Sequence, residues 1–139
     1  MVSRVLVPID GSEMATRALE YALETHPDAE VTLLYVVGEP SPMMGKALRL
    51  VLEEDLGDAA ADLAEGVFAS ARDVAARHGV DVDTEVGLGN PGRVIVDRAA
   101  DFDLVVVGSH GGDLQSRLFV GDVAKAVFQR SPVPVTVVR

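Results

Sequence analysis

Short runs of hydrophobic residues alternate along this chain with longer stretches in which apolar residues recur every three or four positions. Uninterrupted apolar runs of about four to eight residues are typical of buried strands, whereas the longer spacing is typical of amphipathic helices. The pattern therefore predicts strands and helices in strict alternation. The predicted strands are 4–8, 31–37, 80–88, 104–107 and 135–138, and the predicted helices are 12–26, 47–78, 91–100 and 122–129.

The predicted strands are hydrophobic through most of their length, which indicates a sheet covered on both faces. Strands that alternate with helices form parallel sheets with right-handed crossovers. We therefore expect a doubly wound α/β fold, built as a single domain over residues 1–139.

Single residues indicate where several of the predicted helices and loops begin or end. Ser12 is the expected N-cap of the first helix, which has to stop before Pro27. The helix predicted over 47–78 would be about 45 Å long, so we expect a break near Gly57. The segment from Glu39 to Gly45 holds two prolines and is expected to be a flexible loop.

Composition excludes several classes of protein. The absence of cysteine excludes disulfides, zinc ribbons and thiol catalysis. Twenty-two acidic residues against twelve basic ones give a net charge of −10, which argues against nucleic-acid binding. No run reaches the roughly 18 apolar residues of a membrane span, and the amino terminus is predicted to be a strand rather than a signal peptide. We expect a cytoplasmic protein without a membrane partner.

The charged residues are unusual in kind. Ten of the twelve bases are Arg and only Lys46 and Lys125 are Lys, while thirteen of the acids are Asp. An acidic, lysine-poor surface keeps a protein hydrated in concentrated salt and favours a halophilic source. An ordinary acidic protein from a high-GC genome is the alternative.

Candidate ligand-binding segments follow two of the predicted strands. Ligands of doubly wound sheets bind beyond the carboxyl ends of the strands, where 8–12 (PIDGS) and 108–112 (GSHGG) lie. If these loops are neighbours, the second, with Gly121 opening a helix, forms a plausible phosphate cradle. Glycines also end strands for steric reasons, so the spacing leaves both interpretations open.

Five segments occur in a characteristic order: VLVPIDGS at 5–12, LLYV at 33–36, GNP at 89–91, DLVVVGSHG at 103–111 and SPVPVTVV at 131–138. With these segments the chain resembles the universal stress protein family over essentially its full length. The resemblance implies a five-stranded parallel sheet of order 3-2-1-4-5, in the adenine nucleotide alpha hydrolase-like fold. It also implies a homodimer through antiparallel pairing of the last strand, Val133 to Val138.

Some members of that family bind ATP through the signature Gly-x2-Gly-x9-Gly-Ser/Thr. Gly108, Gly111 and Gly121 match its glycines, but Asp122 stands where Ser or Thr is expected. By the resemblance, Pro8, Asp10, Val36 and Val107 would lie near the base. The ribose and phosphates would meet Gly108, Ser109, His110, Gly111 and the backbone of Gly121, Asp122 and Val123.

Asp122 changes what this cradle can bind. A carboxylate about 4 Å from a phosphate costs roughly 1 kcal/mol in water and about 4 kcal/mol at an effective dielectric of 20. As a helix N-cap, Asp122 would also compete with phosphate for the same amides. Mg²⁺ or Mn²⁺ bridging Asp122 and the phosphates could reverse the effect, and Arg117 could add a cation.

Three functions follow from these observations. The first is a stress-response protein that binds ATP or AMP, with no permanent cofactor. The second is a stress-response dimer of the same fold that does not bind ATP and acts through protein contacts. The third is an enzyme, which we do not expect, because no general base or arginine finger is apparent and any ATP hydrolysis should be slow. The three histidines are scattered, so no permanent metal site is expected.

Overall fold

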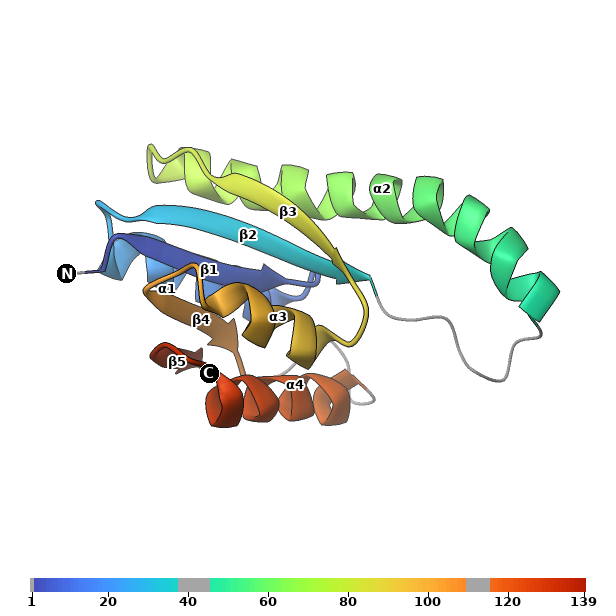
Figure 1. The fold of residues 1–139 in the computed structure, drawn as a ribbon. Helices are drawn as coiled ribbons and strands as arrows, with labels where there is room; N and C mark the ends of the chain where they lie inside the picture. Colours follow the sequence, from blue (N-terminus) through green and yellow to red (C-terminus); the bar gives the residue numbers. More distant parts are fainter. Residues whose placement is uncertain (1, 38–45, 110–115) are drawn as a thin grey trace.

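A computed structural model describes residues 2–37, 46–109 and 116–139, with side chains placed at 2–37, 61–109 and 123–139. The predicted loop from Glu39 to Gly45 lies outside the described residues. The chain forms a twisted sheet with helices on both faces (Figure 1). Its strands are β1 (Arg4–Ile9), β2 (Glu30–Val37), β3 (Asp83–Leu88), β4 (Leu104–Gly108) and β5 (Val135–Val138). Its helices are α1 (Glu13–Thr25), α2 (Lys46–Arg77), α3 (Pro91–Ala99) and α4 (Ser116–Arg130).

The sheet has the predicted topology. All pairings are parallel and the strand order is β3-β2-β1-β4-β5, which confirms the expected order 3-2-1-4-5. β1 lies in the centre, with Val5 paired to Val31 of β2 on one side and to Leu104 of β4 on the other. The strand order reverses between β1 and β4, so their carboxyl ends open into the crevice where such sheets bind ligands.

Two separate aliphatic cores hold the helices on the sheet. Val5, Val7 and Leu33 point to one face, where they pack against α1 and α2. Leu6, Leu34 and Val105 have the opposite parity and pack against α3 and α4. In Figure 1, α3 lies in front of the sheet and α1 behind it. No helix within the described ranges is long and apolar enough to cross a bilayer.

Two glycines that we expected to interrupt helices lie within them. α2 is continuous over 32 residues, so the predicted break near Gly57 is wrong. α4 begins at Ser116, so the prediction that this helix starts at Asp122 is also wrong. A single glycine costs a helix only about 1 kcal/mol relative to alanine, which good helix formers around it can offset. The expected conflict between the length of α2 and the size of the domain does not arise, because its first turns extend past the strands (Figure 1).

The third strand is shorter than predicted. It starts at Asp83 rather than at Val80, because the Val80 amide is used by the turn that ends α2. The Val80 amide donates to the carbonyl of Ala75 at 3.0 Å, and Gly79 there has a φ of +70°. Val80 and Val82 pack against the core on the α2 side, so their hydrophobicity reflects burial rather than strand pairing.

The amino ends of β1 and β4 are joined by one carboxylate. Oδ2 of Asp103 accepts hydrogen bonds from the amides of Ser3 and Arg4, both at 3.0 Å. These two bonds, which favour the charged carboxylate, lower the pKa of Asp103 below its ordinary value. The guanidinium of Arg4 lies 4.8 Å from the ring centroid of Phe102, next to Asp103. This arrangement fixes the end of the sheet opposite the crevice.

Candidate nucleotide site

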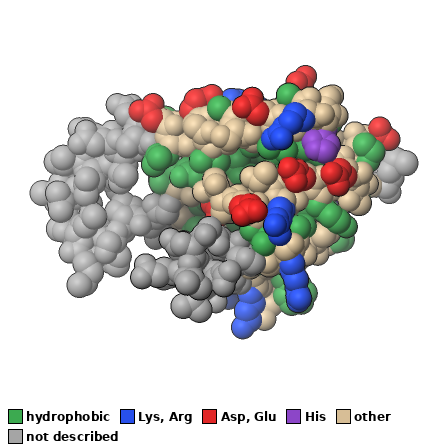
Figure 2. Space-filling view, turned by 180° about the vertical axis from the view of Figure 1, so that it is seen from behind, with side chains coloured by type: hydrophobic (Ala, Val, Ile, Leu, Met, Phe, Trp, Pro, Cys, Tyr) green, Lys and Arg blue, Asp and Glu red, His purple; other side chains and the backbone are tan. Residues whose placement is uncertain are grey.

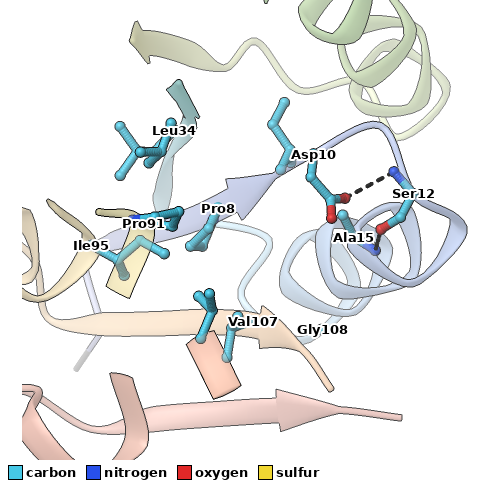
Figure 3. Close-up of a pocket in the computed structure, with 12 residues that line it drawn as sticks. Pro8, Asp10, Ser12, Ala15, Leu34, Pro91, Ile95, Val107 and Gly108 are labelled. Carbon is cyan, nitrogen blue, oxygen red and sulfur yellow. Dashed lines mark hydrogen bonds between the residues drawn. The ribbon is translucent and has the colours of Figure 1, made fainter. Parts of the chain in front are cut away.

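A cavity of about 200 Å³ lies at the carboxyl ends of β1 and β4. The twelve residues that line it come from β1, β2, β4, the loop between β1 and α1, and the helices α1, α3 and α4 (Figure 3). Six of the eleven residues predicted for the site are among them. These are Pro8, Asp10, Val36, Val107, Gly108 and Val123.

The position of the cavity follows from strand parity. Pro8, Val36 and Val107 each lie two residues after a buried side chain of the core that packs against α3 and α4. They therefore continue that core beyond the point where the helices cover it. The walls at this level are apolar, so the cavity suits a flat, weakly polar ring.

The loop between β1 and α1 is fixed by side-chain hydrogen bonds. The Ser12 amide donates to Oδ1 of Asp10 at 2.9 Å, and the Ser12 hydroxyl accepts from the Ala15 amide at 3.2 Å (Figure 3). Ser12 is thus the N-cap predicted from the sequence. Gly11, between Asp10 and Ser12, has a φ of +82°, which glycine adopts without steric strain. Oδ2 of Asp10 accepts no hydrogen bond within the described part of the chain, so a ligand donor can use it.

Six residues of the cavity were not predicted as site residues: Ile9, Ser12, Ala15, Leu34, Pro91 and Ile95. Leu34 and Ile95 are almost completely buried in its wall, and Pro91 lies at the first turn of α3. Leu34 has the same parity as Val36, so the alternation along β2 could have revealed it. Pro91 and Ile95 reach the cavity only because α3 crosses this face of the sheet, which no local pattern indicates.

Fewer of the residues predicted to meet the ribose and phosphates lie at the cavity than of those predicted to lie near the base. The Ser109 amide donates to the carbonyl of Val138 at 2.8 Å, so it extends the pairing of β4 with β5. His110 and Gly111 lie outside the described residues. Gly121 and Asp122 lie within the second turn of α4 rather than at its start. The predicted N-cap role of Asp122 is therefore wrong, since α4 starts six residues earlier.

The cavity is poor in ionisable groups. Asp10 is the one titratable side chain among the described residues that line it. No group of three or more His, Asp or Glu side chains that could hold a metal ion occurs in the described ranges. Within these residues, the geometry supports binding of an organic ring with a polar edge.

Proteins similar to this chain in sequence and in structure belong to one family. The model of the Universal stress protein family matches residues 1–139. The universal stress protein YxiE of Bacillus subtilis is 31% identical over 148 residues, which cover 100% of both chains. The universal stress protein UspA from Lactobacillus plantarum has a similar structure, with a TM-score of 0.83, 32% identity and coverage of 99% of this chain and 98% of that one. A universal stress protein in complex with cAMP has a TM-score of 0.71 and 26% identity, over 99% and 97% of the two chains. The chain belongs to the universal stress protein family.

Proposed function

We propose that this protein is a stress-response homodimer whose cavity binds an adenine nucleotide. The observation that carries the proposal is the convergence of Pro8, Asp10, Val36, Val107 and Gly108 on one cavity at the ends of β1 and β4. A structural relative with 26% identity is described as a complex with cAMP, which supports an adenine nucleotide as the ligand class. A cytoplasmic location is consistent with membership of the family.

The residues present fit a nucleoside. The apolar walls, which include Leu34, Val36 and Val107, would hold the adenine ring, and Oδ2 of Asp10 would accept a hydrogen bond from a hydroxyl or amino group. Gly108 adds no side chain to the wall, so a ligand can approach its backbone closely. This arrangement binds a ligand by burial of its ring, and one carboxylate orients it.

The number of phosphates that the site accepts depends on Asp122. A Ser or Thr at this position would donate a hydrogen bond to phosphate, whereas a carboxylate repels it. We expect weak or absent ATP binding without a divalent cation, and Mg²⁺ or Mn²⁺ could bridge Asp122 and the phosphates. This substitution also favours a second candidate function, a dimer that does not bind ATP and acts through protein contacts.

We expect binding rather than turnover. Hydrolysis of ATP needs a group that positions the attacking water and cations that stabilise the transition state. Asp10 is the one ionisable side chain among the described residues of the cavity, and no Lys or Arg joins it there. Any ATPase activity should therefore be slow.

The proposed dimer forms through β5. This strand lies at the edge of the sheet, and an apolar edge strand is a ready site for pairing with another chain. Val137 on β5 is 40% exposed, and Phe128 on α4, which contacts β5, is 65% exposed. Sedimentation at micromolar protein in high salt should show a dimer, and a monomer alone would contradict the proposal.

Nucleotide binding is tested most directly on purified protein. Mass spectrometry of the denatured protein should reveal a copurified adenine nucleotide, and titration calorimetry with ATP, AMP and cAMP should rank the ligands. Val107→Phe fills the cavity and should abolish binding, whereas Asp97→Asn on the exposed side of α3 should leave it unchanged. Binding that survives Val107→Phe would place the ligand elsewhere. If no nucleotide binds the wild type, the second candidate function is favoured.

A further inference from the structure

A second cavity, of about 220 Å³, lies on the opposite side of the sheet from α3 and α4. We call it the α1–α2 groove. α1 contributes Ala15, Thr16 and Leu19, and α2 contributes Gly66, Val67 and Ala71. Ile9, Ser12 and Ala15 line both cavities, so the groove adjoins the proposed nucleotide site at the start of α1.

The groove has an apolar floor that is continued by an exposed leucine. Leu19 and Ala15 are buried in it, and Val67 is partly buried. Leu63 lies one helical turn before Val67 on the same side of α2 and is 62% exposed. Gly66 leaves this wall open, because a methyl group there would have no neighbour within 4 Å.

The rims of the groove are acidic. Glu20 and Glu24 lie along α1, one and two turns after Thr16, and neither makes an ion pair within the described part of the chain. Asp62 and Asp73 flank the groove on α2 and are likewise unpaired among the described residues. Figure 2 shows hydrophobic side chains along the middle of this face, with acidic side chains on both sides.

Two bases lie on the same face but compensate little of this charge. Arg17 is already paired with Glu13 at 3.4 Å. Arg77 lies at the carboxyl end of α2, at one end of the groove. The groove therefore combines an apolar floor with a negative rim.

We propose that the α1–α2 groove docks a basic amphipathic helix of a partner protein. An apolar stripe of such a helix would lie on the floor, and its Lys or Arg side chains would reach the acids of both rims. The groove residues of α1 run from Ala15 to Leu19 and those of α2 from Gly66 to Ala71, so the groove seats about one to two turns of the partner helix. A second copy of this chain is a poor occupant, because α1 itself carries three acids and one base and would bring like charges to the rim.

The test uses a labelled helical peptide of leucine and lysine, with leucines on one face and lysines on the other. Fluorescence anisotropy measures its binding to the full-length protein at about 0.15 M and about 1 M KCl, since salt screens the rim charges. A peptide with glutamate in place of lysine is the charge control. We expect the lysine peptide to bind, more weakly at high salt, and the glutamate peptide not to bind.

Two neighbouring residues of α2 provide matched protein variants. Ser70→Leu places a side chain in the groove, whereas Ala69→Leu adds the same side chain on the exposed surface beside it. Ser70→Leu should weaken peptide binding about ten-fold, and Ala69→Leu should change it less than about two-fold. Gly66→Leu is a second groove variant with the same expected effect, and circular dichroism confirms that each variant is folded.

Charge variants separate specific docking from general attraction to an acidic protein. Glu20→Gln combined with Asp73→Asn should weaken binding several-fold, and Asp97→Asn on α3 should have a smaller effect. Equal binding by the Ser70→Leu and Ala69→Leu variants would overturn the proposal, as would binding of the glutamate peptide. Sedimentation in which Ser70→Leu dissociates an assembly of the wild type would assign the groove to a second copy of the chain instead.

Discussion

Gly108 at the end of β4 contacts Met14 of α1 so closely that no side chain fits between them. A methyl group on Gly108 would lie 2.8 Å from Cγ of Met14 and 3.0 Å from its carbonyl oxygen. The second contact is with backbone, so a change in the Met14 rotamer cannot relieve it. The first glycine of the proposed nucleotide motif therefore also sets the distance between α1 and the sheet.

Gly108→Ala should destabilise the protein and weaken nucleotide binding together. Overpacking of this kind typically costs about 1–3 kcal/mol, and it would move the start of α1, where Asp10 and Ser12 line the cavity. Urea unfolding and nucleotide titration measure the two effects. Gly66→Ala is the matched control, because a methyl group there has no neighbour within 4 Å and should stabilise α2 by about 0.5–1 kcal/mol. Equal stability of the two variants would contradict the close contact.

The pH dependence of stability should reveal the role of Asp103. Hydrogen bonds from the amides of Ser3 and Arg4 lower the pKa of this carboxyl in the folded state, and the unfolded chain lacks these bonds. The folded state therefore gains stability at pH values above the ordinary pKa of 3.8, and this gain is lost as the pH falls through the lower folded value. At neutral pH the wild type should melt above Asp103→Asn, and the difference should shrink below about pH 4.

Thermal melts of both proteins between about pH 3 and pH 7 provide this test. Asp97→Asn, which changes an exposed carboxylate on α3, controls for the loss of one negative charge. A difference between wild type and Asp103→Asn that stays constant over the whole range would mean that the two amide bonds do not depend on ionisation of the carboxyl.

The doubly wound parallel sheet could be predicted because each strand is a strong local pattern that alternates with helices, and the resemblance to the universal stress protein family supplied the strand order. The course of the helices at Gly57 and Gly121 could not be predicted in this way. One glycine costs a helix about 1 kcal/mol, and tertiary packing decides whether the helix continues. Val80 and Val82 were assigned to a strand for a similar reason. Burial against α2 and pairing with β2 produce the same hydrophobic pattern.

The candidate site was predictable where it depends on strand ends. Pro8 and Asp10 follow from the carboxyl end of β1, and the resemblance to the universal stress protein family added Val107 at the end of β4. Pro91 and Ile95 could not be found in this way, because α3 brings them to the cavity from a distant part of the sequence. The direction of a helix across the sheet is a property of the whole fold.

The melting temperature should rise with KCl up to molar concentrations. Twenty-two acidic residues in 139 repel one another at low ionic strength, and the screening length falls from about 30 Å at 0.01 M to about 3 Å at 1 M. A steep rise would support adaptation to concentrated salt, whereas a flat profile between about 0.1 M and 2 M would favour an ordinary acidic protein. Sodium sulfate is an unsuitable substitute for KCl, because sulfate also strengthens hydrophobic burial.

The preference for nucleotides should depend on Asp122. Asp122→Ser removes one negative charge and supplies a hydroxyl donor, within the second turn of α4. If the carboxylate excludes triphosphate, relief of roughly 1–4 kcal/mol of repulsion should tighten ATP binding by about five-fold to several hundred-fold at fixed salt. AMP, which carries less charge, should gain less, so the ratio of the two affinities is the sharper measurement. Asp97→Ser controls for the change in net charge.

A metal bridge gives the opposite result for the same variant. If Mg²⁺ or Mn²⁺ links Asp122 to the phosphates, wild type should bind ATP only with the metal, and Asp122→Ser should weaken that binding. Titration of ATP into both proteins, with metal and with EDTA, therefore separates repulsion from bridging. Failure of both proteins to bind ATP, AMP or cAMP under any of these conditions would contradict the nucleotide site itself. Gly108, Gly111 and Gly121 would then be structural, and the function would lie in contacts with other proteins.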